Sequence, residues 1–151
     1  MAALDTLDVA QLTSGQIRSL GNAALAGLTT AQVNNLSTAQ VAALTADQLK
    51  VLSTNQVVAL STAQAAALTS SQVAGLSPTQ ITAMQTDDVA ALTNSALNAL
   101  NAAQVKALTT AQVVGLTTTQ AAGLNKTFAA ALTSAQLKAM ETGDLAKLTT
   151  S

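Results

Sequence analysis

Hydrophobic and polar positions repeat along the chain with a period of eight residues. Leucine closes each octad and recurs without a slip from Leu4 to Leu148, with Met84 and Met140 filling the two places that lack it. The residue after each leucine, position 0, is Ser, Thr, Asp or Asn in sixteen of nineteen octads, and position 3 is Gln in twelve of eighteen. Position 4 is always Val, Ile, Leu or Ala, and the leucine itself is position 7. We therefore expect residues 1–151 to form a single array of about eighteen octads, as a segment of a larger protein.

Three structures can carry such a repeat. In one long helix, each leucine would be displaced by about 80° from the one before, so the apolar stripe would wind out of reach of any partner. In a β-solenoid, the even period would keep Leu and Gln on one strand face, but alanine, which is abundant here, is depleted in strands. The third structure is a chain of very short helices, one per octad, and it explains the motif best.

The polar positions of the octad match the capping box that starts a helix. A Ser or Thr hydroxyl at position 0 accepts a hydrogen bond from the backbone N–H of position 3, and Gln at position 3 reaches back to the N–H of position 0. Gln→Ala substitutions at position 3 of several octads should cost stability additively, by about 0.5–1 kcal/mol each. We assign this capping role to Ser37 with Gln40, Ser53 with Gln56, Ser77 with Gln80 and Thr109 with Gln112.

Proline and the acidic residues support the same helix starts. Pro78 follows the cap Ser77 and so takes the first helical position, where proline is favoured, and it excludes Ser77 from the helical conformation. Asp8, Asp88 and Asp144 replace Gln at position 3, in the positive first turn of the helix dipole.

The apolar positions predict how the helices pack. An octad of one extended cap residue and about seven helical residues gives a helix of roughly 10 Å, too short to be stable alone. Stacking must therefore bury positions 4 and 7, while the small residue usually found at position 6 lets backbones approach closely. We predict an all-α solenoid of very short helices, a superhelix with about three helices per turn. The predicted core includes Leu36, Val41, Leu44, Leu52, Val57, Leu60, Leu108 and Val113.

Composition removes several functions. Charged residues make up 9% of the chain, against roughly 25% in typical domains, and there is no His or Cys to act as metal ligand or general base. The six basic residues are scattered, so we expect no nucleic-acid partner. The uncharged stretch Val51–Thr86 is interrupted by polar residues and predicts no membrane span, and the first residues do not form a signal peptide. We expect no catalysis and no cofactor.

The units Leu28-Thr-Thr-Ala-Gln-Val33, Leu36-Ser-Thr-Ala-Gln-Val41 and Leu108-Thr-Thr-Ala-Gln-Val113 carry a resemblance that covers the whole chain. They resemble the octapeptide tracts of very large, adhesin-like bacterial surface and secreted proteins. That resemblance implies an extracellular or cell-surface location and a stalk or spacer role. The short-helix spacing is also similar to the repeats of the mesothelin and stereocilin group, and the Leu-Thr-x-x-Gln string to small periplasmic chaperones of the Spy type.

Few residues suggest a site. Phe128 replaces Gln in its octad, and we expect it to fill the space left where Ala129 replaces the usual valine. Ca²⁺ needs about six oxygen ligands, more than any local loop offers, so we interpret the acidic pairs as helix-start residues and predict no metal site. These pairs are Asp5 with Asp8, Asp87 with Asp88, and Glu141 with Asp144.

Three functions fit the sequence. The first is a structural segment of a bacterial surface or secreted protein that spaces, displays or adheres, without catalysis. The second is a self-assembling module that forms filaments through open apolar ends around Leu4 and Leu148. The third is a chaperone-like solenoid that binds proteins in an apolar groove.

Overall fold

The computed structural model describes residues 6–140, which form short helices and contain no strand. Each helix has four to six residues, one per octad, so the short-helix prediction is confirmed. The helices are shorter than the predicted seven residues. Their bounds are α1 Thr6–Gln11, α2 Ser14–Ser19, α3 Asn22–Ala26, α4 Thr30–Asn34, α5 Thr38–Ala43, α6 Ala46–Lys50, α7 Thr54–Val58, α8 Thr62–Ala66, α9 Ser70–Gly75, α10 Pro78–Ala83, α11 Thr86–Ala91, α12 Asn94–Leu97, α13 Ala102–Ala107, α14 Thr110–Val114, α15 Thr118–Ala122, α16 Lys126–Ala131 and α17 Ser134–Ala139.

Capping boxes start most of these helices. At α5, the Gln40 backbone N–H donates to the Ser37 hydroxyl over 3.1 Å, and the Ser37 N–H donates to Gln40 Oε1 over 2.7 Å. All twelve glutamines at position 3 lie in such a box, including those of the predicted pairs Ser53 with Gln56, Ser77 with Gln80, and Thr109 with Gln112. Pro78 takes the first helical position, as expected.

Two consecutive extended residues, and not the single cap residue predicted, form the junction between α5 and α6. Leu44 has φ −60° and ψ 143°, and Thr45 has φ −77° and ψ 161°. The Leu44 N–H donates to the carbonyl of Val41, three residues back, so the helix closes with a tight last turn. No described residue has a positive φ, so these helix ends use no left-handed glycine.

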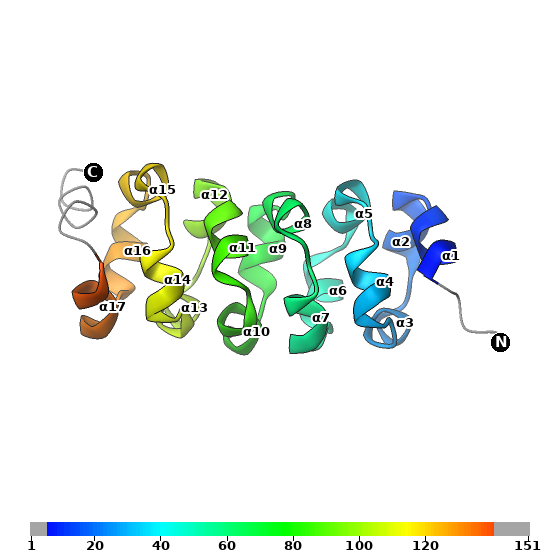
Figure 1. Ribbon diagram of the computed structural model, residues 1–151, viewed down its shortest axis with the longest axis horizontal. Coiled ribbons are helices and arrows are strands. Elements are labelled where there is room, and N and C mark those ends of the chain that lie inside the picture. The colour runs from blue at the N-terminus through cyan, green and yellow to red at the C-terminus, as the bar shows by residue number, and fades with distance from the viewer. Residues whose placement is uncertain (1–5, 141–151) are drawn as a thin grey trace.

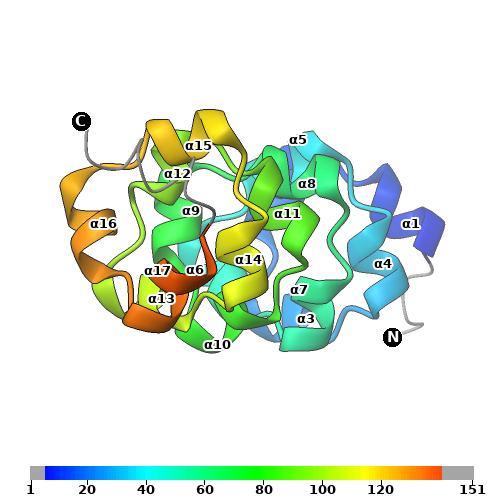
Figure 2. The ribbon, with the colours of Figure 1, turned by 60° about the vertical axis from the view of Figure 1, so that its left-hand side comes forward.

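The helices wind into an elongated superhelix. Each helix packs mainly on the helix three places along the chain, as α2 does on α5, α6 on α9, and α11 on α14. Figure 1 shows α1 and α17 at opposite ends of the long axis, and in Figure 2 α8, α11 and α14 follow one another along one side. This pairing agrees with a turn of about three helices.

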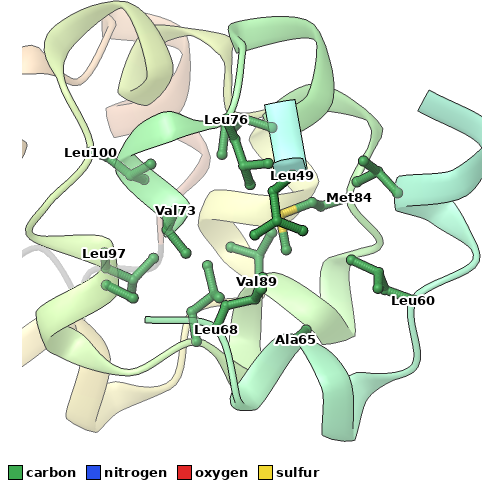
Figure 3. Packing of buried hydrophobic residues seen from close by; sticks show 14 of the residues in the cluster. Leu49, Leu60, Ala65, Leu68, Val73, Leu76, Met84, Val89, Leu97 and Leu100 are labelled. Carbon is green, nitrogen blue, oxygen red and sulfur yellow. The ribbon is translucent and has the colours of Figure 1, made fainter. Parts of the chain in front are cut away.

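The core is one thin column along the superhelix. Positions 4 and 7 fill it, and Figure 3 shows core side chains from helices three places apart, such as Leu49 of α6, Val73 of α9 and Leu97 of α12. The structure buries Leu36, Val41, Leu44, Leu52, Val57, Leu60, Leu108 and Val113 in this column.

Small residues at position 6 allow helices three apart to come close. A Cβ placed on Gly75 of α9 would lie 2.7 Å from Ala46 Cβ of α6, a separation that real Cβ atoms do not show. Added carbons on Gly115 and Gly123 would collide with Thr86 and Asn94. The close approach predicted for position 6 is therefore present. None of the described helices is long and apolar enough to cross a membrane.

Candidate functional site

The buried glutamines link successive turns of the superhelix. Gln72 Nε2 in α9 donates to the carbonyl oxygens of Val41, over 2.8 Å, and Leu44, over 2.7 Å, at the end of α5. Within residues 6–140, ten glutamines make the same contact with the helix four places earlier, and their Nε2 atoms lie 2.6–2.8 Å from the carbonyl oxygen of position 7. They are Gln40, Gln48, Gln56, Gln64, Gln72, Gln80, Gln104, Gln112, Gln120 and Gln136. We call this row the glutamine ladder.

The ladder refines the predicted superhelix. Helices three places apart make the closest packing, but the amide bonds join helices four places apart. One superhelical turn therefore contains between three and four helices, slightly more than the predicted three.

Each ladder glutamine satisfies backbone groups at two helix ends. Its Oε1 accepts from the N–H at the start of its own helix, and its two amide hydrogens go to carbonyls at the end of an earlier helix. These are groups that a helix leaves without intrahelical partners. Gln72 is only 2% exposed, and burial of its amide is tolerated because all of its polar atoms are paired.

The family of the chain follows from the same octads. The segment Ala107-Leu-Thr-Thr-Ala-Gln112 contains the cap, the ladder glutamine and the preceding leucine in one hexapeptide. The family model of the ALTTAQ repeat matches residues 1–38, 23–52, 34–62, 47–78 and 81–118. The chain belongs to the ALTTAQ repeat family. A search of curated proteins finds no match.

The Gln of the ALTTAQ octad thus does more than cap, and the sequence predicted only the capping role. The signal was present, because Glu never stands at position 3. A capping box accepts either Glu or Gln, and Glu would gain from the helix dipole. A position that holds Gln in twelve of eighteen octads and never Glu is one where an N–H donor is favoured.

Three ALTTAQ octads inside the described chain interrupt the ladder, with Asp88, Ala96 and Phe128 at position 3. Phe128 is 1% exposed and fills the core, as expected. An asparagine pair links the turns there, since Asn98 Oδ1 accepts from the Asn125 N–H over 2.8 Å and the Asn98 amide donates to the Gly123 carbonyl over 2.8 Å.

Asp88 is the unusual interruption. Its carboxyl is 2% exposed, Oδ1 accepts from the Thr62 hydroxyl over 3.0 Å, and Oδ2 has no hydrogen-bond partner. Burial raises the pKa of Asp88 above its usual range, with a smaller rise from Asp87, while the hydrogen bond from Thr62 opposes the shift. Asp88 thus places a carboxyl where ten other octads place an amide donor.

The other candidate groups do not converge. Among the described residues, no three His, Cys, Asp or Glu side chains are placed to hold a metal ion. Of the acidic pairs considered above, Asp5, Glu141 and Asp144 lie outside the described residues. A shallow depression of about 460 Å³ between α13 and α16 is lined by Lys106, Lys126 and small residues, with no further group that would define a ligand.

Proposed function

We propose that this chain is a structural rod segment of a bacterial cell-surface or secreted protein, where it spaces or displays other parts of that protein without catalysis. The observation that carries the proposal is the glutamine ladder, which joins each turn to the turn before it along most of the described chain. The resemblance of the octads to adhesin-like bacterial tracts supports the surface or secreted location.

The ladder supports a spacer role because it opposes deformation. Opening one turn would break the two amide bonds of a rung such as that of Gln72 and expose core leucines. Each broken hydrogen bond costs about 1 kcal/mol net, and more if its partner stays buried. Because each turn contacts only its neighbours, the same resistance to opening is present at every turn of the rod. The length of the rod grows with the number of octads.

The scarcity of exposed large hydrophobic side chains along the sides of the rod favours a spacer role over the chaperone-like alternative. In residues 6–140, the large hydrophobic side chains that are exposed are Val58, at 43%, and Val114, at 44%. Two separated valines offer little apolar surface to an unfolded client. Most other exposed positions carry alanine or small polar residues.

The proposal is tested by exchanging the array within its parent protein. In one variant, an unrelated helical rod of equal length replaces the array. In a matched variant, the array is replaced by a flexible Gly/Ser linker with the same number of residues. Surface display and adhesion should persist with the rod and fall with the linker. Loss of adhesion with the rod would show that side chains of the array bind a partner themselves.

Location needs its own measurement. Antibodies against the array, or protease added to intact cells, should reach it, and a cytoplasmic protein should stay untouched in the same sample. An array that becomes accessible only after lysis would contradict the surface or secreted part of the proposal.

A further inference from the structure

Two successive rungs are missing from the glutamine ladder in the middle of the described chain. At position 3, where the ladder has Gln, α11 carries Asp88 and α12 carries Ala96. A ladder amide reaches the position-7 carbonyl 28 residues back, so the carbonyls that correspond to these two positions are those of Leu60 and Leu68. Within residues 6–140, no ladder amide reaches either carbonyl. We call this gap, with α7 and α8 on one side and α11 and α12 on the other, the open seam.

Few polar contacts replace the missing rungs. The Thr62 hydroxyl donates to Asp88 Oδ1 over 3.0 Å, and the exposed Gln85 amide donates to the Val58 carbonyl over 3.0 Å. Both contacts belong to α11. In the described part of the chain, no side-chain hydrogen bond joins α12 to an earlier helix, because the amides of α12 donate only to later residues.

The third interruption of the ladder, at Phe128, is not equivalent. The rungs of Gln120 and Gln136 on either side of it are present, and Asn98 joins the turns by accepting from the Asn125 N–H over 2.8 Å. The open seam is therefore the place in residues 6–140 where two successive rungs are absent.

The packing that remains across the open seam is mainly apolar. α8 packs on α11 and α9 packs on α12, and Figure 3 shows Ala65, Leu68 and Val89 in this part of the core. Ala65 fills less of the core than the Val, Ile or Leu that most octads place at position 4. Apolar contacts have no preferred direction, whereas a hydrogen bond restricts the distance and angle between its groups. The core thus holds the two turns together without fixing the angle between them.

The missing rungs lie on one side of the superhelix. Two successive helices cover about half of one turn, because a turn contains between three and four helices. Rungs are present on both flanks of the gap, where Gln80 joins α10 to the end of α6 and Gln104 joins α13 to the end of α9. The spacing between turns is therefore fixed at these flanks and is not fixed by any ladder amide at the open seam.

We propose that the superhelix bends at the open seam. α7 and α8 move away from α11 and α12 on the side without rungs, and the flanking rungs of Gln80 and Gln104 form the pivot. The bend has one direction, because only that side lacks the amide bonds that oppose opening. This inference rests on the ladder and does not depend on the proposed spacer function or on the location of the protein.

The test measures distances between pairs of spin labels on the purified 151-residue chain, which has no cysteine of its own. Ala63→Cys with Ser95→Cys places the labels at exposed positions of α8 and α12, across the open seam. The matched control is Ser71→Cys with Ala103→Cys, at the same octad position of α9 and α13 and also exposed. The Gln104 rung joins the helices of the control pair.

Double electron–electron resonance gives the distribution of distances for each pair. The seam pair should give a broader distribution than the control pair, extended toward longer distances. Asp88→Gln combined with Ala96→Gln supplies both missing amides and should narrow the seam distribution to the width of the control. Asp88→Gln alone adds one rung and leaves the fully buried Ala96 unchanged, and it should narrow the distribution in part.

The proposal is overturned if the two pairs give distributions of equal width in the chain with its native ladder. It is also overturned if neither folded variant narrows the distribution of the seam pair. The comparison of the two pairs leaves every ladder residue unchanged, so it decides the question even where the double variant fails to fold. Far-UV circular dichroism verifies that each labelled chain remains helical.

Discussion

Replacing Gln72 by Glu separates the two roles of the ladder glutamine. The side chains have the same shape, and Glu keeps the oxygen that accepts from the Thr69 N–H at 2.8 Å. A capping box alone would therefore tolerate the change, since Glu is a standard member of that motif. The ladder predicts the opposite, because Glu lacks the N–H groups that donate to Val41 and Leu44 and brings its own oxygen toward both carbonyls.

The magnitude follows from the hydrogen bonds of Gln72. Gln72→Ala removes the three short side-chain bonds, to Thr69, Val41 and Leu44, and a longer one of 3.4 Å to the Ala42 carbonyl. At about 1 kcal/mol for each short bond, it should lower the free energy of unfolding by about 3 kcal/mol. Capping alone would predict about 0.5–1 kcal/mol. Gln72→Glu should cost about 3–5 kcal/mol at neutral pH, the range expected for a buried charge without a partner.

The cost of Gln72→Glu should depend on pH. Burial beside two carbonyl oxygens raises the pKa of the introduced carboxyl above the value of about 4.3 that it has in the unfolded chain. Stability should therefore be highest below about pH 4, where the neutral acid can donate to one carbonyl, and should be lost as pH rises through the folded pKa. At low pH the Glu variant should be more stable than the Ala variant, and at neutral pH the order should reverse or the two should be equal.

Urea denaturation followed by far-UV circular dichroism measures these differences at several pH values. Gln16→Glu is the matched control, because Gln16 makes the same capping box but is exposed and makes no ladder bond in the described structure. It should change stability by less than about 0.5 kcal/mol. If Gln72→Glu is as harmless at neutral pH as Gln16→Glu, the inter-turn amide bonds do not stabilise the fold.

Three further predictions concern the interrupted rung and the packing between helices. Asp88→Gln should raise stability by about 1–2 kcal/mol at neutral pH, because it adds amide donors for the carbonyls at the end of α7. Asp87→Gln makes the same charge change on an exposed neighbour and should have little effect. Equal melting temperatures for the two variants would contradict this prediction. Because the pKa of Asp88 is raised in the folded state, the stability that this residue contributes is fully present below its unfolded pKa and is lost as pH rises through its folded pKa. Asp88→Asn should therefore make the free energy of unfolding less dependent on pH between about pH 4 and pH 7. A pH dependence unchanged from the wild type would argue against the unpartnered carboxyl. Gly75→Ala should cost about 1–3 kcal/mol, because the new Cβ meets Ala46 Cβ of α6. Gly15→Ala in α2 should instead stabilise by about 0.5–1 kcal/mol, because its new Cβ would meet only Thr13 Oγ1, at an ordinary contact distance of 3.9 Å. Calorimetric melting that shows both substitutions shifting stability in the same direction would refute the close packing of α6 and α9.

Local chemistry is the part of this protein that its sequence alone determines. A capping box joins residues three apart, so Ser37 with Gln40 and Pro78 after Ser77 mark helix starts whatever surrounds them. The octad period also identifies positions 4 and 7 as core, since a helix of this length has only one face to bury. The all-α solenoid, its thin core and the close approach at position 6 follow from these rules.

Only the tertiary structure decided which turns meet. The direction of each new helix depends on the backbone angles at the junction before it, such as those of the extended residues Leu44 and Thr45 before α6, and small differences in these angles determine how many helices complete one turn. That number selects the carbonyls that the Gln72 amide reaches, 28 and 31 residues back, and leaves Asp88 with a buried oxygen that nothing pairs. A period of eight gives every octad the same local residue pattern and therefore the same local structure. The pattern does not indicate on which turn each octad will stack.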